Sequence, residues 1–200
     1  MDLTKTELPD VGQVIHREHQ DLYAVLTCLR LMTRKSKDEA RPLNAAAVRQ
    51  AFDYMETVLN AFHHPKEDEY LFPVLRVRCP DLGAVIDELE TQHRQMPDML
   101  EQLRAALARY EAAPETERDT MCDAIEACCR REIGHMKLEE SKILKQARTS
   151  LTGADWATID AAFADNANPL FGDEKDAAYT ALYQDLLAAM PAPYGYGKPA

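Results

Sequence analysis

Two stretches of the chain repeat the same pair of potential metal ligands. His63 and Glu67 stand four residues apart, and His135 and Glu139 show the same spacing further along. On a helix, residues four apart project from the same face, one turn above the other. Each pair therefore offers an imidazole and a carboxylate in one direction, which is half of a metal site that facing helices can complete.

Each of these pairs is preceded by one more histidine at a similar separation. His19 precedes the first pair and His93 precedes the second, so both halves read as a histidine, a connection and then His-x-x-x-Glu. A helix rises about 1.5 Å per residue, which brings the histidines of antiparallel neighbours to the same height. We therefore expect four imidazoles and two carboxylates to converge at the middle of a helical bundle.

Such a cluster would be costly to bury without metal. Ionised carboxylates in a core need partners, and neutral imidazoles need hydrogen bonds. Two divalent or trivalent ions would satisfy both demands, and paired carboxylates can bridge two metals. The mixed nitrogen and oxygen ligands suit iron, manganese, cobalt or zinc, and the sequence alone does not choose among them.

The remaining sequence predicts the helices that would hold these ligands. Glycine is scarce, with 7 residues, and long stretches rich in Ala, Leu, Glu, Arg and Met favour helices almost throughout. Four long helices are expected, over about residues 10–33, 45–79, 80–113 and 115–147. Their short connections predict an all-α, up-down-up-down four-helix bundle.

Capping residues and prolines refine this prediction. The polar residues 34–39 are expected to form a connection, and Asn44 is a good N-cap for the second helix. Pro65 falls inside that helix, where a missing N–H predicts a kink or bulge beside the ligand pair.

The C-terminal quarter predicts an appendage to the bundle. Thr152-Gly153-Ala154-Asp155 is typical of a capping box that opens a short fifth helix, and a last helix is expected at about residues 173–189. We therefore expect a metal-binding bundle over residues 10–150 and a C-terminal helical extension, residues 151–200, packed on it.

Composition and charge exclude several classes of partner. The formal net charge of −11 argues against nucleic acid or an anionic membrane, since both need a basic face. No run of about 18 apolar residues is long enough to span a membrane, and the first residues lack the apolar core of a signal peptide. The 5 cysteines form no Cys-x-x-Cys pair, which argues against a disulfide framework. We expect a cytoplasmic protein.

Together these residues resemble the hemerythrin-like, or HHE cation-binding, domain family. The resemblance covers about residues 10–150 and rests on Ile15-His16-Arg17-Glu18-His19, His63-His64-Pro65-Lys66-Glu67-Asp68, Gln92-His93 and His135-Met136-Lys137-Leu138-Glu139-Glu140. It implies a four-helix bundle around an oxo-bridged, non-haem di-iron centre, with manganese or zinc as alternatives to iron. It also implies four terminal ligands, His19, His63, His93 and His135, and two bridging ligands, Glu67 and Glu139.

One departure bears on oxygen carriage. The O₂ carriers of the family place two histidines four apart on the third helix, and a histidine followed by an aspartate on the fourth. Here Pro97 stands four residues after His93, and the fourth helix has the His135 and Glu139 pair instead. One imidazole is therefore missing, which argues against simple reversible O₂ carriage because the number of ligands decides which metal keeps an open position.

Two further histidines stand beside the predicted ligands. His16 lies one turn before His19 and is a candidate seventh ligand. Alignment of the two halves places Glu90 opposite His16, which favours a role behind the ligands or at the surface. The same alignment places Met136 opposite His64, and since a methionine cannot replace a hard-metal ligand, His64 is predicted to lie outside the ligand set.

Four other side chains have weaker signals. Asp68 and Glu140 follow the two carboxylate ligands, and we interpret them as charges on the helix surface. Tyr23 and Tyr70 stand one turn from ligands and are predicted to face the site. Core packing is the usual role of such tyrosines, and a hydrogen bond to bound oxygen is the alternative.

Three functions are compatible with this pattern. The sequence offers no nucleophilic serine or cysteine with a base and no Gly-rich phosphate loop, so its chemistry would be metal chemistry on small ligands. The favoured function is binding or sensing small oxidants such as O₂ or nitric oxide. An enzyme that decomposes peroxide, and a metal-stabilised structural or iron-storing bundle, are the alternatives. The expected partner is a diatomic molecule or peroxide, and the sequence leaves the oligomeric state open.

Overall fold

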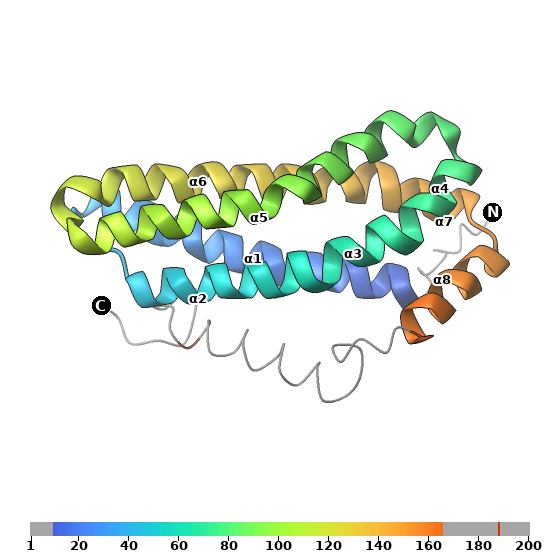
Figure 1. Cartoon of the computed structure of the whole chain (residues 1–200), viewed down its shortest axis with the longest axis horizontal. Helices are drawn as coiled ribbons and strands as arrows, with labels where there is room; N and C mark the ends of the chain where they lie inside the picture. Colours follow the sequence, from blue (N-terminus) through green and yellow to red (C-terminus); the bar gives the residue numbers. More distant parts are fainter. Residues whose placement is uncertain (1–9, 166–187, 189–200) are drawn as a thin grey trace, which may run out of the picture.

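The computed structural model describes residues 10–165 and Ala188. Within these residues every element is helical, and four long runs lie side by side with alternating direction (Figure 1). The first run is α1 (Asp10–Asp38) and the third is α5 (Gly83–Ala112), preceded by a 3₁₀ turn, η3 (Pro80–Leu82). The second run joins α2 (Ala45–Met55), η1 (Glu56–His63), α3 (His64–Lys66), η2 (Glu67–Leu71) and α4 (Phe72–Arg78). The fourth joins α6 (Pro114–Leu138), η4 (Glu139–Leu144) and α7 (Lys145–Ser150).

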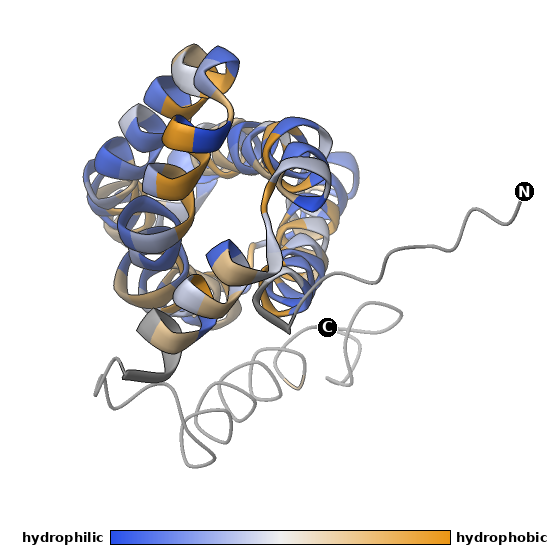
Figure 2. Cartoon of the chain, turned by 90° about the vertical axis from the view of Figure 1, so that its right-hand side faces the viewer, coloured by the Kyte–Doolittle hydropathy of each residue, from blue (hydrophilic) through white to orange (hydrophobic). Residues whose placement is uncertain are grey.

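The predicted all-α, up-down-up-down four-helix bundle is therefore confirmed. The helix α6 packs along both α1 and α5, and α2 packs against α1 and α5. In the end-on view of Figure 2 the helices surround a common axis.

Local signals in the sequence explain where several helices begin. Asn44 caps α2, because its side-chain Oδ1 accepts a hydrogen bond of 3.1 Å from the backbone N–H of Ala47. Thr152 and Asp155 form the predicted capping box, in which each side chain accepts a bond from the backbone N–H of the other, at 3.2 and 2.8 Å. This box opens α8 (Gly153–Asp165), which packs against α1 and η2. The last helix expected, at about residues 173–189, lies outside the described residues except for Ala188.

The expected end of the first helix was wrong. The polar residues 34–38 are helical, so α1 continues to Asp38 and the connection is shorter than predicted. Lys37 forms an ion pair with Asp123 of α6, and the hydroxyl of Ser36 donates a bond of 2.6 Å to the carbonyl of Arg41. Ala40, at a φ of 52°, then ends the helix in the left-handed conformation.

The second and fourth runs contain π-helical turns next to the predicted ligands. The elements η1 and η2 flank the short α3 that contains Pro65, which confirms the predicted irregularity. A third π segment, η4, begins at Glu139 and was not predicted, since no proline marks it. π turns are rare and often occur at functional sites, because the wider turn changes the direction of side chains relative to a regular α-helix.

Two apolar cores occupy the two halves of the bundle. The core nearer the α1–α2 connection, here called the distal core, includes Leu26, Phe52, Leu103 and Ile125. The core nearer α8, here called the proximal core, includes Ile15, Phe72, Ile86 and Trp156. Burying each such side chain contributes about 1.5–3 kcal/mol.

A layer of buried polar residues, to which all four runs contribute, separates these two cores. We call it the polar layer, and it contains His19, His63, Glu67, His93, His135 and Glu139. On α1, for example, His19 lies between Ile15 of the proximal core and Leu22 of the distal core. The apolar cores on both sides thus fix the height of the polar layer and offset the cost of burying it.

No helix among the described residues is both long and apolar enough to cross a membrane. The cytoplasmic location stays a prediction.

Tyr110 gives a test of the fold away from the polar layer. Its buried hydroxyl accepts a 2.7 Å hydrogen bond from the backbone N–H of Leu43 and donates to the carbonyl of the same residue at 3.2 Å. Tyr110→Phe leaves both backbone groups unsatisfied, so we expect a loss of about 1–3 kcal/mol in the free energy of unfolding. Urea unfolding of the metal-free protein measures it. Tyr23→Phe is the matched control, because Tyr23 is 53% exposed and its hydroxyl can bond to water; equal midpoints for the two variants would contradict the assignment.

Candidate metal centre

The structure brings all six predicted ligands together in the polar layer. None is more than 5% exposed, and the two glutamates are fully buried. Two overlapping groups of four have ligand atoms that lie within 4.8 Å of one another. The first position is surrounded by His19, His63, Glu67 and Glu139, and the second by Glu67, His93, His135 and Glu139. Both glutamates belong to both positions, which is the arrangement of a two-metal site with shared carboxylates.

The imidazole nitrogens are spaced as neighbouring ligands of one ion. The Nε2 atoms of His19 and His63 are 3.0 Å apart, and those of His93 and His135 are 3.1 Å apart. Two ligands that bind one ion at about 2.1 Å and at right angles are separated by about 3.0 Å. Each pair therefore fits adjacent corners of an octahedron.

Glu139 spans the two positions with separate oxygens. Its Oε2 lies 3.1 Å from Nε2 of His19, and its Oε1 lies 3.0 Å from Nε2 of His135. Oε2 of Glu67 lies between the positions as well, 3.6 Å from His63 and 3.7 Å from His93. These distances suit carboxylates that bridge two ions.

The outer nitrogen of each imidazole is held by a hydrogen bond to a neighbouring helix. Nδ1 of His19 bonds to Glu140 at 2.9 Å, and Nδ1 of His63 to Glu18 at 2.9 Å. Nδ1 of His93 bonds to Asp68 at 2.8 Å, and Nδ1 of His135 to Gln92 at 2.8 Å. Because these oxygens accept, each Nδ1 carries a proton, and each Nε2 faces the centre, where a metal would bind it in place of any proton.

These four bonds form a closed ring around the bundle. They join the first run to the fourth, the second to the first, the third to the second and the fourth to the third. They also follow the repeat in the sequence, since Asp68 and Glu140 each follow a carboxylate ligand. The interpretation of these two residues as surface charges was wrong, and their position directly after each ligand was the signal that identified them.

The buried carboxylates lack the partners that a core charge needs. All four oxygens of Glu67 and Glu139 accept no well-aligned hydrogen bond from any described residue. Burial and the neighbouring Glu139 raise the pKa of Glu67 well above its usual range. Burial would also raise the pKa of Glu139, but the surrounding imidazoles, His135 foremost, hold it well below its usual range. These buried oxygens lack hydrogen bonds, and the Nε2 atoms of four imidazoles face them. A cation would bind both kinds of atom and offset the cost of their burial, so the donor set fits a metal.

The imidazoles of the metal-free site differ in charge. Burial lowers the pKa of His19, but the adjacent carboxylates of Glu139 and Glu140 outweigh it and raise that pKa to about 9. His93 also reaches a pKa of about 9 against the effect of burial, through its bond to Asp68 and the nearby carboxylate of Glu139. Burial lowers the pKa of His63, which keeps this ring neutral. Protons therefore occupy part of the space that a metal would take.

The first position has a buried ion pair behind it that the second lacks. Nζ of Lys66 lies 2.6 Å from Glu18, and Lys66 is 4% exposed. Although burial alone would raise it, the bond to His63 and the charge of Lys66 lower the pKa of Glu18 to about 2. At the second position Gln92, an uncharged amide, takes the place of Glu18.

His16 and the two tyrosines lie outside both groups. His16 is half-exposed, and its Nδ1 bonds at 2.8 Å to the same Glu140 oxygen that holds His19. This places it behind the ligands, in line with the role that the sequence favoured. Tyr23 is 53% exposed, so the prediction that it faces the site was wrong, and Tyr70 packs against the proximal core.

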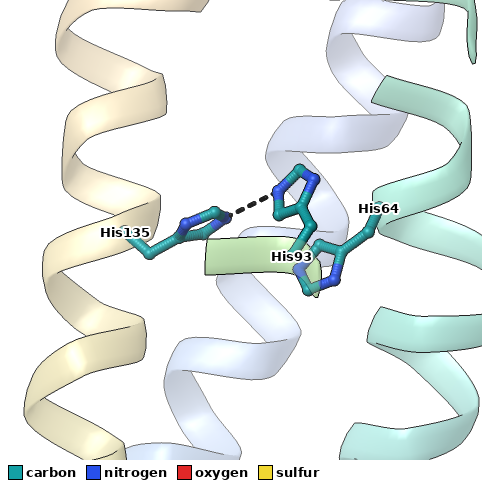
Figure 3. Close-up of side chains that lie close together, drawn as sticks. All are labelled: His64, His93 and His135. Atoms are coloured by element: carbon teal, nitrogen blue, oxygen red, sulfur yellow. Dashed lines mark hydrogen bonds between the residues drawn. The ribbon is translucent and has the colours of Figure 1, made fainter. Parts of the chain in front are cut away.

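Two further buried polar residues lie near the centre: His64, which the sequence placed outside the ligand set, and Glu132, which the sequence analysis did not single out. His64 is 4% exposed and stacks on His93, with ring centroids 3.9 Å apart (Figure 3). Its position next to His63 was the signal available in the sequence. Glu132 is 3% exposed, and burial raises its pKa to about 7; it lies nearly one turn before His135.

Comparison with known proteins agrees with this geometry. Residues 10–147 match the model of the hemerythrin HHE cation binding domain. The chain belongs to this family. The hemerythrin-like assignment made from the sequence is thereby confirmed. The buried His and Glu clusters are arranged as a cation site requires, in agreement with a cation-binding domain.

Three curated proteins are similar to this chain over most of its length. Uncharacterized proteins of Mycobacterium bovis and of two strains of Mycobacterium tuberculosis are each 23% identical to this hemerythrin-like chain over 158 residues. The match covers 78% of this chain and 61% of each relative, so the chain spans about three fifths of their length. No solved structure matches the chain.

Replacing one shared carboxylate separates metal binding from folding. In the metal-free protein burial and Glu139 hold Glu67 neutral, so Glu67→Gln removes the cost of protonating this carboxyl on folding and should not lower the free energy of unfolding near pH 7. The amide cannot bridge two cations, so metal content should fall well below that of the original protein. The stabilisation gained from metal, about 2.7 kcal/mol at a hundredfold excess over Kd, should also be lost.

Glu69→Gln is the control, because Glu69 is exposed on the same helical run. Metal analysis and thermal unfolding with and without metal measure both quantities. A Glu67→Gln variant that keeps the original metal content and stabilisation would refute the shared-ligand role.

Metal affinity should increase with pH up to about pH 9. The pKa of both His19 and His93 is about 9, so below that pH a metal must displace protons from their rings. In the metal-free protein the same protons contribute stability that is fully present below about pH 6.5 and is lost as the pH rises through 9. Competition for Zn²⁺ with a chelator of known protonation, between pH 6.5 and 9.5, measures the trend. Asp68→Asn should make the rise less steep, because it lowers the pKa of His93 and leaves that of His19, and a flat profile for the original protein would contradict the assignment.

Proposed function

We propose that this hemerythrin-like protein binds two iron ions at the shared site and binds or senses small oxidants such as O₂ or nitric oxide. The observation that carries the proposal is the pair of buried positions, each with two inward imidazoles and a share of two carboxylates. Oxygen and nitrogen donors in this mixture suit iron, with manganese and zinc as less favoured occupants.

The number of protein donors supports a role in binding small molecules. Two imidazoles and one oxygen from each glutamate supply four donors per position, whereas octahedral coordination takes six. Pro97 supplies no further donor, since it has no ligating atom and is exposed. Positions are therefore left for molecules from solution, and bound iron would supply the redox chemistry toward them.

Burial restricts which molecules can arrive. All six ligand residues are at most 5% exposed, and the outer residues that flank them, Glu18 and Glu140, are only partly accessible. Diatomic molecules and peroxide are small enough for such a site. A metabolite-sized substrate could not reach the buried ligand residues.

Decomposition of peroxide is the second candidate. The absence of a third imidazole at Pro97 favours it, because catalysis on an oxidant requires coordination sites that protein does not fill. A purely structural role would not need the open positions, since structural metal sites are closed by protein ligands.

The decisive experiment combines metal analysis with optical spectra. Protein reconstituted with iron, reduced without air and then exposed to O₂ should hold about two irons per chain and develop charge-transfer absorption. Stopped-flow mixing with O₂, nitric oxide and peroxide then separates the two candidates. Reversible or stoichiometric reaction supports binding or sensing, and repeated release of O₂ from peroxide supports the enzyme. A single ion per chain, or no spectral response to any of the three, would refute both.

A further inference from the structure

One buried imidazole beside the metal centre has unsatisfied hydrogen-bonding groups. His64 is 4% exposed, and neither of its ring nitrogens has a hydrogen-bond partner among the described residues. A neutral imidazole carries one N–H donor and one acceptor, and leaving them unsatisfied in a core costs free energy. The His64 ring is therefore suited to form a hydrogen bond with a bound molecule that is not part of the protein chain.

The His64 ring lies against the second position. It stacks on His93, with centroids 3.9 Å apart and planes inclined by 12°, and its centroid is 5.5 Å from that of His135 (Figure 3). Nitrogen atoms from these three rings lie within 4.8 Å of one another. His64 is thus adjacent to the two imidazoles of the second position, although it follows His63 of the first in the sequence.

The stacking geometry argues against His64 as a ligand of the same ion. An ion bound through the lone pair of His93 lies close to the plane of the His93 ring. Because the His64 ring is stacked nearly parallel to it, that ion lies well out of the His64 plane and away from its lone pairs. His64 is placed to contact a molecule bound beside the ion rather than the ion.

The two halves of the protein differ at this residue. The internal repeat pairs His64 with Met136, which is 5% exposed and packs in the distal core. A thioether has no N–H to donate. The repeat that makes the two metal positions alike therefore gives only one half an imidazole at this place.

We propose that a small anion binds to the ion of the second position, beside His93 and His135, and that His64 donates an N–H hydrogen bond to it. The inference rests on the proposed metal function. It adds that the second position binds the exogenous ligand and that His64 selects this ligand. The ligand class is a small anion with a terminal nitrogen or oxygen acceptor, for which azide is the probe.

Azide titration of the iron-loaded, oxidised protein tests the inference. Absorbance gives the azide Kd, and metal analysis gives the iron content of every variant. We expect His64→Met to keep both irons and to weaken azide binding about tenfold, the effect of losing one hydrogen bond. His64→Gln should keep most of the affinity, because its amide can still donate. Met136→Leu, the matched change in the other half, should leave the azide Kd unchanged.

Several results would overturn the proposal. An unchanged azide Kd in His64→Met would show that His64 makes no such bond, and loss of iron from that variant would make His64 a ligand instead. A crystal structure of the azide complex should show azide on the ion held by His93 and His135, within hydrogen-bonding distance of His64. Azide on the ion held by His19 would refute the assigned position. Original protein that fails to take up two irons would refute the proposed function first, before any variant is compared.

Discussion

The structure depends on the burial of two carboxyl groups, Glu67 and Glu139, at the centre of a bundle whose other layers are apolar. Both are fully buried, and none of their oxygens has a well-aligned hydrogen bond within the described chain. In the absence of metal, one carboxyl is kept neutral by burial and its neighbour, while the other is held ionised by imidazoles. Cations at the two shared positions would satisfy both groups, which links metal uptake to the stability of the fold.

The histidines can serve this centre because each is oriented from outside. Four hydrogen bonds from Nδ1 atoms connect successive helical runs in a closed ring. Each bond fixes the ring orientation and keeps a proton on Nδ1, so the Nε2 atoms already face the centre before metal arrives. The two apolar cores above and below keep the ring at one height, and the π turns begin or end at His63, Glu67 and Glu139, where the ligands project.

The near twofold repeat of the site is broken in its surroundings. Behind the first position lie a carboxylate and a buried ammonium, Glu18 and Lys66, whereas Gln92 supports the second. His64 adds a neutral imidazole to the side of the second position, where it stacks on His93. Two positions with the same ligand types therefore differ in field and in hydrogen-bonding capacity, and such differences control affinity and redox behaviour at metal sites.

The sequence by itself determined the helices, the bundle and the six residues that converge, because ligand spacing and apolar periodicity are local properties that a helix converts directly into faces and heights. It also determined the caps at Asn44 and Thr152, whose partners lie within three residues. Only the tertiary structure decided what surrounds each ligand. The roles of Asp68, Glu140 and His64, and the exposure of Tyr23, depend on how neighbouring helices rotate against one another. A single π turn changes the direction in which the following side chains point. The sequence around η4 gives no sign of such a turn, because π turns form where packing and buried polar groups outweigh the regular α-helical hydrogen bonds.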